Sequence, residues 1–343
     1  MKKLWLHSVR SYLRLGMFFY FKRIYVHGLE NVPKDKPVLL LANHQNALLD
    51  ALLIATKCGR FSFFLTRAAV FKKALVSKLL KSLQMLPVYR VRDGWSNISN
   101  NIAIFESCSE ILNNNEAIVI FPEGSHNLAR RVRPLSKGFT RIVFDTLDKY
   151  PDLDLQLVPV GLNFVKATSF PDSAAIYFGS PISGSSFITE NRNQDIVKLK
   201  SKIKEELSKL TTNIPEKNYD YILNKLDGLQ VNYLKPDKVN TCIQSDFEKY
   251  DEKLKPSNNL LKRIFKYLLI LNILIPYFLW SYVFKPRIKE PEFKSTFRFA
   301  IALTLVPLYL LIIAVTLSIT ISLSIGLSYL FIVLIISLIT VKL

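Results

Sequence analysis

The sequence predicts an α/β fold, in which a mixed sheet is flanked by helices, with an N-terminal interfacial helix and a C-terminal transmembrane hairpin. Short apolar runs with the length of buried strands alternate with helical patterns through the first two thirds of the chain. From Phe299 to Val341 there is no Asp, Glu, Lys, Arg or His, over about twice the roughly 20 residues that one span needs. These two observations separate an α/β domain from a membrane region.

The expected elements follow from the spacing of apolar residues along the chain. Continuous apolar runs predict strands, and apolar residues at intervals of three and four predict helices. Strands are expected at Ile24–Leu29, Val38–Ala42, Phe61–Leu65, Leu86–Gly94, Ala117–Phe121, Leu155–Asn163 and Ala174–Phe178. Helices are expected at Ala47–Ala55, Ala68–Leu83, Trp95–Leu112, Leu135–Asp148 and Asp195–Leu210.

Composition divides the chain into four predicted parts. Residues 1–22 interleave aromatic and basic side chains, which is typical of a helix in the lipid headgroup layer; a helix packed on the domain is the alternative. Residues 23–212 are expected to form the α/β domain, and residues 213–262 a polar linker that is helical or irregular. Residues 263–343 are expected to form the membrane region.

The membrane region is expected to cross the bilayer twice, at about 299–320 and 325–342. A third crossing by 267–284 would place the basic loop 285–298 opposite the basic residues at 262–266, against the positive-inside tendency. A re-entrant or interfacial helix at 267–284 keeps both basic clusters on one side. We therefore expect the α/β domain on the cytoplasmic face of a membrane.

The net charge of +19, from 46 Lys and Arg against 27 Asp and Glu, calls for an anionic partner. The sequence has no zinc-ligand spacing, RNA-binding aromatic signature or clear helix-turn-helix pattern, so membrane lipids are expected as partners and nucleic acid is not. Cys58, Cys108 and Cys242 lie far apart without a CxxC pair, which predicts reduced thiols and no metal.

The first candidate site lies where the apolar run Val38–Ala42 meets a polar cluster. Catalytic groups gather at such carboxyl ends of strands in open α/β sheets. Asn43 and Asn46 are candidate helix N-caps, and His44 would lie at the strand-to-helix turn close to Asp50. A His with a nearby carboxylate can take a proton from a hydroxyl. The alternative is that His44 caps the helix and Asp50 is a solvated surface acid.

A second apolar strand, Ala117–Phe121, also runs straight into polar residues. Gly124 allows a tight turn there, and Glu123 can accept hydrogen bonds from substrate hydroxyls. Ser125 and His126 are adjacent without a GxSxG motif, so they do not indicate a hydrolase nucleophile. Two such strand ends in one α/β unit favour a shared site over chance.

Two arginines lie in the strand-like segment after Leu86. Arg90 and Arg92 are two residues apart, so on an extended backbone their side chains point to the same side. They could hold a phosphate through forked, charge-assisted hydrogen bonds. Two exposed arginines on an edge strand are the alternative.

Four ordered motifs resemble the glycerophospholipid acyltransferase family. They are NHQNALLD at 43–50, LPVYR at 86–90, FPEGS at 121–125 and VPVGL at 158–162. The resemblance implies that His44 is the general base, that Asp50 orients it, and that Arg90, Glu123 and Gly124 bind the phosphate and glycerol of the acceptor. We extend the expected substrate-binding residues to Asn43, Ser125, His126 and Arg130, with no metal ligand among them.

The sequence departs from the family pattern at two points. Five residues separate His44 from Asp50 where the family usually has four, and one extra residue turns a regular helix by about 100°. Either the first helical turn is irregular or the pair is looser. His126 also stands where the family usually has an arginine, whose phosphate role would pass to Arg130, Arg131 or Arg133 or be absent.

The expected function is a membrane-bound O-acyltransferase. It would move a fatty acyl chain from acyl-CoA or acyl carrier protein to the hydroxyl of 1-acylglycerol 3-phosphate, without a cofactor. Glycerol 3-phosphate, another lysolipid or an aminolipid are alternative acceptors. A non-enzymatic protein that binds anionic lipid is the alternative of another class; it explains the charge and the tail but leaves the two strand-end clusters without a purpose.

Overall fold

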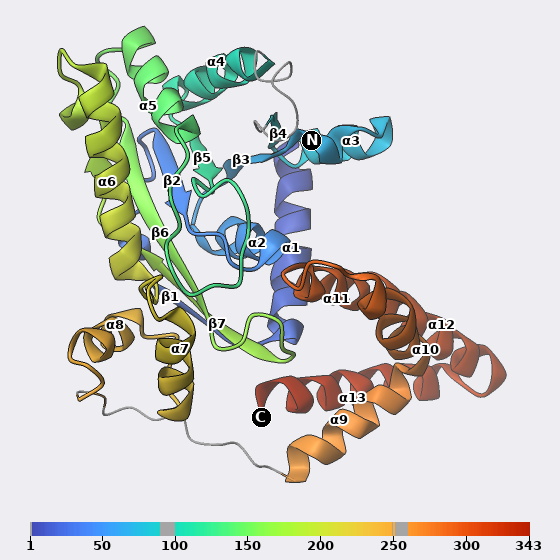
Figure 1. Ribbon diagram of the computed structural model, residues 1–343. Helices are drawn as coiled ribbons and strands as arrows, with labels where there is room; N and C mark the ends of the chain where they lie inside the picture. The colour runs from blue at the N-terminus through green and yellow to red at the C-terminus, as the bar shows by residue number, and fades with distance from the viewer. Residues whose placement is uncertain (1, 90–99, 249, 251–259) are drawn as a thin grey trace.

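The computed structural model describes residues 2–89, 100–248, 250 and 260–343. Figure 1 shows a twisted sheet with helices on both faces, and a group of C-terminal helices beside the N-terminal helix α1 (Lys2–Tyr20). The fold is thus α/β with a mixed sheet, as expected, followed by a helical tail. The sheet and the tail meet along α1.

The sheet has eight strands in the order β1-β7-β6-β2-β5-β3-β4, with β8 paired to β6. Neighbours are parallel except β6 with β7 and β6 with β8, which are antiparallel. The strands are β1 (Phe21–His27), β2 (Val38–Ala42), β3 (Ser62–Arg67), β4 (Met85–Val88), β5 (Ala117–Ile120), β6 (Gln156–Phe164), β7 (Asp172–Phe178) and β8 (Ile182–Ser183).

Helices cover both faces of the sheet, as the burial of β2 indicates. Val38, Leu40 and Ala42 belong to one core cluster and Leu39 and Leu41 to the other, because successive side chains of a strand point to opposite faces. A strand buried on both faces reads as a continuous apolar run. The helices of the α/β part are α2 (Ala47–Lys57), α3 (Ala74–Ser82), α4 (Asn100–Asn113), α5 (Gly138–Lys149) and α6 (Arg192–Leu210).

The segment expected to be a polar linker contains two packed helices, α7 (Tyr219–Gly228) and α8 (Pro236–Gln244). Ile214, Leu226 and Val239 form the centre of a small core that these helices share. The Tyr177 hydroxyl of β7 donates to the Leu234 carbonyl at 2.7 Å. This part of the chain is therefore docked on the sheet.

The tail begins with α9 (Leu260–Asn272) and α10 (Leu274–Phe278), which continues as a π-helical turn over Leu279–Phe284. The chain bends by 101° between α9 and α10, at the break after Asn272. Pro276 cannot donate the hydrogen bond that would join it to the carbonyl of Asn272, which accounts for a break at this point.

Three helices follow: α11 (Phe293–Leu303), α12 (Leu305–Thr320) and α13 (Leu323–Lys342). By length and composition, Phe293–Thr320 and Leu323–Lys342 could each cross a membrane, and the bent pair would make a third crossing if it counts as one span. The turn after Thr320 lies far from the sheet, and the other ends of the hairpin lie close to it (Figure 1). Lys342 Nζ donates to the Phe21 carbonyl at 2.8 Å, which ties the end of α13 to β1.

Candidate active site

His44 and Asp50 form a hydrogen-bonded pair at the carboxyl end of β2. His44 Nδ1 lies 2.8 Å from Asp50 Oδ2. The Asp50 side chain is fully buried and that of His44 is 13% exposed. An ionised carboxylate can only accept, so in the neutral imidazole Nδ1 carries the proton and Nε2 keeps its lone pair. The ring is thus oriented to accept a proton at Nε2.

An irregular first turn of α2 brings the pair together across the longer spacing. Ala47 has a φ of 43°, which is uncommon for a residue with a side chain, so the chain does not follow a regular helix here. Asp50 Oδ2 also accepts from the backbone N–H groups of Gln45 and Asn46, at 2.8 and 2.7 Å. Asp50 therefore stabilises the start of the helix and orients His44 with the same oxygen.

The loop after β5 packs against one face of the His44 ring. Phe121 stacks on the imidazole with ring centroids 4.0 Å apart, and the Asn127 N–H donates to the His44 carbonyl at 3.0 Å. The Asn46 side chain does not cap α2 but donates to the Ala167 carbonyl at 3.1 Å. The two strand-end clusters therefore meet, as their sequence pattern predicts.

Glu123 is paired with an arginine ten residues further along the chain. Arg133 Nε donates to Glu123 Oε2 at 2.9 Å, and its Nη1 donates to Ser125 Oγ at 2.8 Å. The Glu123 side chain is only 2% exposed. Burial raises the pKa of Glu123, and the charge and hydrogen bonds of Arg133 oppose that rise. Arg133 thus fixes the Glu123–Ser125 turn.

Gly124 occupies a backbone conformation that favours glycine. Its φ is 72°, in the left-handed region, and its N–H donates to the Phe121 carbonyl at 3.0 Å to close the turn. A Cβ at this position would meet no atom within 4 Å, so the constraint is on the backbone and not on space.

Two of the predicted substrate-binding residues have interior partners instead. The Asn43 amide exchanges hydrogen bonds with the Leu162 backbone at 3.0 and 2.7 Å, which joins β2 to β6. Arg130 donates to the carbonyls of Phe164 and Val165 at 2.8 and 2.7 Å. Its guanidinium lies 3.5 Å from the ring centroid of Tyr233. Both side chains therefore hold the fold together.

The other arginines considered for phosphate binding differ in whether they contact the site. Arg131 pairs with Glu216 at the surface, with N and O atoms 2.8 Å apart. Of the three arginines of the loop, Arg133 is the one that contacts the Glu123–Ser125 turn. Arg90 lies outside the described residues.

His126 links the site to the C-terminal helical tail. Its ring lies edge-on to His44, with centroids 5.6 Å apart, and its Nε2 donates to Glu290 Oε2 at 2.8 Å. Phe293, at the start of α11, contacts the same ring. The ligand atoms of His126, Glu290 and Glu292 lie within 4.8 Å of one another and could hold a metal ion. His126 Nε2 is already hydrogen-bonded to Glu290, and we assign no metal role to the cluster.

Sequence reasoning missed three residues that shape this site: Phe121 as the stacking partner, Arg133 as the partner of Glu123, and Glu290 as the contact from the tail. The apolar run ending at Phe121 was the available signal for the first. The other two depend on loop and tail contacts that no local pattern encodes.

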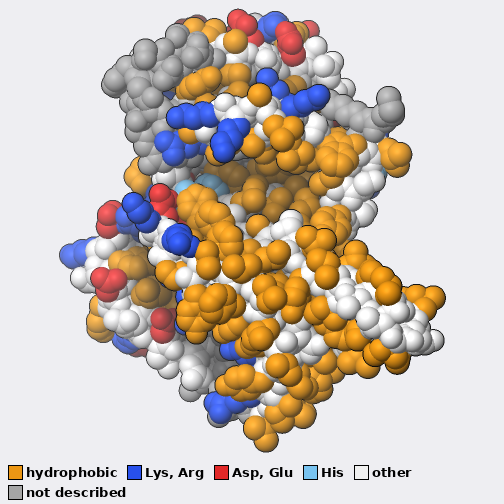
Figure 2. Space-filling model, turned by 90° about the vertical axis from the view of Figure 1, so that its right-hand side faces the viewer, with side chains coloured by type: hydrophobic (Ala, Val, Ile, Leu, Met, Phe, Trp, Pro, Cys, Tyr) orange, Lys and Arg blue, Asp and Glu red, His pale blue; other side chains and the backbone are white. Residues whose placement is uncertain are grey.

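The site lies in a recess of the molecular surface. Figure 2 shows histidine side chains at the floor of a hollow whose lower rim is built from apolar side chains. An imidazole with a free lone pair, oriented by a buried carboxylate, can act as a general base toward a hydroxyl group held in this hollow. The apolar rim can accommodate the hydrocarbon part of an amphipathic molecule.

Part of the chain is similar to known acyltransferases. Residues 23–163 match the model of the Acyltransferase family. Glycerol-3-phosphate O-acyltransferase 1 of Saccharomyces cerevisiae is 33% identical over 79 residues, which are 23% of this chain and 10% of that protein. The chain therefore spans a small part of this relative.

A shorter relative is covered more fully. The 1-acyl-sn-glycerol-3-phosphate acyltransferase of Borreliella burgdorferi is 22% identical over 223 residues, 65% of this chain and 79% of that protein. The crystal structure of PlsC, the 1-acyl-sn-glycerophosphate acyltransferase of Thermotoga maritima, aligns with a TM-score of 0.45 and 20% identity over 60% of this chain and 78% of that one. Residues 23–163, less than half of this chain, are thus similar to the acyltransferase family.

Proposed function

We propose that this protein is a membrane-bound O-acyltransferase that moves a fatty acyl chain from acyl-CoA or acyl carrier protein to the hydroxyl of 1-acylglycerol 3-phosphate. The observation that carries the proposal is the 2.8 Å contact of His44 with Asp50 in a segment similar to the acyltransferase family. The contact leaves Nε2 able to take a proton.

The reaction is a direct transfer. His44 Nε2 accepts the proton of the acceptor hydroxyl as its oxygen attacks the thioester carbonyl, and Asp50 stabilises the imidazolium that forms. The tetrahedral intermediate then expels the thiolate, which takes the proton from His44. The thioester is already activated, so the transfer needs no covalent acyl-enzyme, and we propose no cofactor or metal.

The acceptor phosphate requires cations near the base. Arg90 is proposed for this role from its motif, and Arg133 stands beside Ser125 in the site, partly neutralised by Glu123. The interior partners of Arg130 make it a poor phosphate ligand. Holding the phosphate positions the hydroxyl against His44, and such positioning can supply a large share of the rate.

Membrane attachment would bring the site to its lipid substrates. Besides the two candidate spans, α1 exposes Leu4, Leu15 and Phe18, and α3 exposes Leu75 to 82% and Leu79 to 48%. Amphipathic helices of this kind lie in the headgroup layer. The basic residues at the domain end of the tail support a cytoplasmic α/β domain.

Glycerol 3-phosphate is the second candidate acceptor. The yeast relatives carry the name glycerol-3-phosphate O-acyltransferase, and one of them is 33% identical over 79 residues. This acceptor has no acyl chain and would use the polar part of the same site.

An acceptor panel tests the proposal. Membranes containing the protein are given palmitoyl-CoA or palmitoyl-acyl carrier protein with lysophosphatidate, glycerol 3-phosphate, another lysophospholipid or a lyso-aminolipid. Thiol release and labelled lipid product are measured against membranes containing the His44→Ala variant. Acceptor-dependent thiol release with lysophosphatidate supports the proposal. Binding to anionic vesicles without acyl transfer to any acceptor would replace it with the non-enzymatic alternative.

A further inference from the structure

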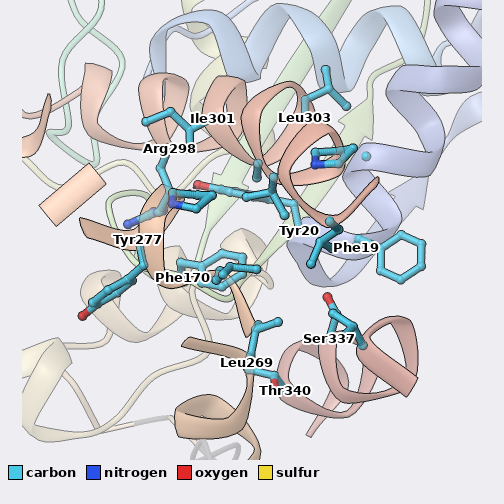
Figure 3. Close-up of a pocket in the computed structure, with 18 of the residues that line it drawn as sticks. Phe19, Tyr20, Phe170, Leu269, Tyr277, Arg298, Ile301, Leu303, Ser337 and Thr340 are labelled. Carbon is cyan, nitrogen blue, oxygen red and sulfur yellow. Dashed lines mark hydrogen bonds between the residues drawn. The ribbon is translucent and has the colours of Figure 1, made fainter. Parts of the chain in front are cut away.

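A large apolar cavity lies between α1 and the tail helices, apart from the candidate active site. Its volume is about 720 Å³, and neither His44 nor Asp50 lines it. Figure 3 shows Ser337 of α13 and Leu269 of α9 approaching the space from one side, with Tyr20 of α1 across from them. The volume falls within the range of sites that hold small organic ligands.

The cavity wall is mostly hydrocarbon. Leu269 and Ile273 on the first part of the tail, Leu310 on α12, and Val333 and Leu334 on α13 line it. A chamber of this size between helices long enough to cross a membrane suits an acyl chain. Water has few polar partners there.

The charged side chains of the lining are all cationic. Lys262, Lys266 and Arg298 line the cavity, and no Asp or Glu does so among the described residues. The Arg298 guanidinium is held by neutral partners: it donates to the Tyr20 hydroxyl at 2.9 Å and to the Ser169 carbonyl at 2.6 Å. Its hydrogen-bond partners thus carry no charge, and the buried Asp172 carboxylate interacts with it electrostatically.

One further cation, Lys22 of β1, lies close enough to Lys262 to repel it, although Lys22 does not line the cavity. Lys22 Nζ donates to the carbonyl of Leu343, at the C-terminal end of the tail, at 2.6 Å. Burial lowers the pKa of Lys22, and the charge of Lys262 lowers it further. An anion bound between these lysines would relieve their mutual repulsion.

The basic end of the cavity, at Lys262 and Lys266, lies where a membrane would have its headgroups. The ends of the hairpin that meet the sheet mark the boundary of the candidate spans (Figure 1). Tyr277 and Trp280 line the cavity, and such aromatic side chains gather at membrane interfaces. Anionic lipid headgroups attract lysines placed at this level.

We propose that this cavity binds one anionic phospholipid of the bilayer, with its phosphate against Lys262 and Lys266 and an acyl chain between α12 and α13. The lipid would join α1 to the tail. The proposal concerns a resident lipid and does not depend on acyl transfer at His44.

Lipid retention tests the occupant. The full chain is purified in detergent, and bound phospholipid is counted by native mass spectrometry. The wild type is expected to retain about one phospholipid per chain. Ser337→Phe fills the cavity from α13 and should reduce retention at least fivefold, whereas the control Thr316→Phe, on an exposed position of α12 outside the cavity, should not. Equal retention by both variants overturns the proposal.

The selectivity for anionic lipid tests whether Lys262 and Lys266 bind the phosphate. Delipidated protein is offered phosphatidylglycerol and phosphatidylcholine in equal amounts, and the ratio bound is compared. The double variant Lys262→Gln, Lys266→Gln should lower the preference for phosphatidylglycerol at least fivefold. The control Lys72→Gln, Lys73→Gln, at exposed positions before α3, should leave it unchanged. An unchanged ratio in the first variant contradicts the assignment, and displacement of the lipid by palmitoyl-CoA or lysophosphatidate would make the cavity a substrate site instead.

Discussion

His44 and Asp50 meet at 2.8 Å across five intervening residues, because the chain takes a left-handed step at Ala47 before α2 becomes regular. The same Asp50 oxygen accepts from two backbone N–H groups of that turn. A carboxylate with three donors on one oxygen is held rigidly, and so is the ring that it orients. The longer spacing therefore keeps the pair intact.

Replacing Asp50 by Asn should lower kcat by about 10³–10⁴-fold, in line with the loss seen when a carboxylate that orients a histidine becomes an amide. The amide cannot stabilise an imidazolium and favours the wrong tautomer of His44. The measurement is kcat at saturating palmitoyl-CoA and acceptor, with circular dichroism to establish the fold. Asp152→Asn, at an exposed turn, is the matched control. Wild-type kcat in Asp50→Asn would remove Asp50 from the mechanism.

Removing the partner of Glu123 should destabilise the domain. Arg133→Ala leaves a buried carboxylate without its cation and should cost about 3–5 kcal/mol. Arg131→Ala breaks only the exposed pair with Glu216 and should cost less than about 1 kcal/mol. Unfolding in denaturant measures both losses.

The loss in Arg133→Ala should also depend on pH. Burial raises the pKa of Glu123, and removal of Arg133 lets it rise further. A folded-state pKa above the unfolded value means that the folded state binds the proton more tightly, so stability falls as pH rises through that window. The destabilisation should therefore be larger at pH 8 than at pH 5, and Glu123→Gln in the same chain should remove the difference. A pH-independent loss would show that Glu123 is not the group left uncompensated.

Gly124 should resist substitution for a conformational reason alone. Gly124→Ala forces a side chain into a φ of 72° and should cost about 1–2 kcal/mol. A methyl group at Gly228 would also meet no atom within 4 Å, but Gly228 lies at the end of α7 without a left-handed φ. Gly228→Ala should therefore be neutral or stabilising by up to about 1 kcal/mol. Equal effects of the two substitutions on thermal unfolding would contradict the constraint at Gly124.

Ionisation of Asp172 should lower the free energy of unfolding as the pH rises from about 4 to about 6. Burial raises the pKa of Asp172 to about 6, above its unfolded value of about 3.9, so its proton is lost at a cost to the folded state as pH rises. Asp172→Asn keeps an acceptor for the Lys166 N–H and removes the titration. The free energy of unfolding of the variant, measured relative to that of the wild type, should therefore be about 2–3 kcal/mol higher at pH 7.5 than at pH 4. A constant difference in free energy of unfolding across this range would contradict the raised pKa.

The strands that position the site could be predicted because their sequence pattern is local. The run Val38–Ala42 is apolar at every residue, since both faces of β2 are buried, and it ends where the polar residues begin. Ala117–Ile120 repeats the pattern beside it in the sheet. Strands that are parallel neighbours bring their carboxyl ends together, so the meeting of the His44 and Glu123 clusters follows from the topology.

The partners of the site residues could not be predicted in the same way. Asn43 pairs with Leu162 and His126 with Glu290, residues that lie 119 and 164 positions away. Arg130 and Arg133 belong to one basic loop, and only the folded loop decides that the first turns inward and the second reaches Glu123. The small core around Leu226 was hidden because its apolar residues are spread through a polar segment.

The most direct measurement is acyl transfer by the His44→Ala variant, in membranes, with lysophosphatidate and palmitoyl-CoA. The account predicts that turnover falls by about 10⁴-fold or more, at least as far as in Asp50→Asn, while the protein stays folded and membrane-bound. His27→Ala, which removes a ring stacked on Tyr177 at the end of β1, should keep normal turnover. Near-normal turnover in folded His44→Ala would contradict the account.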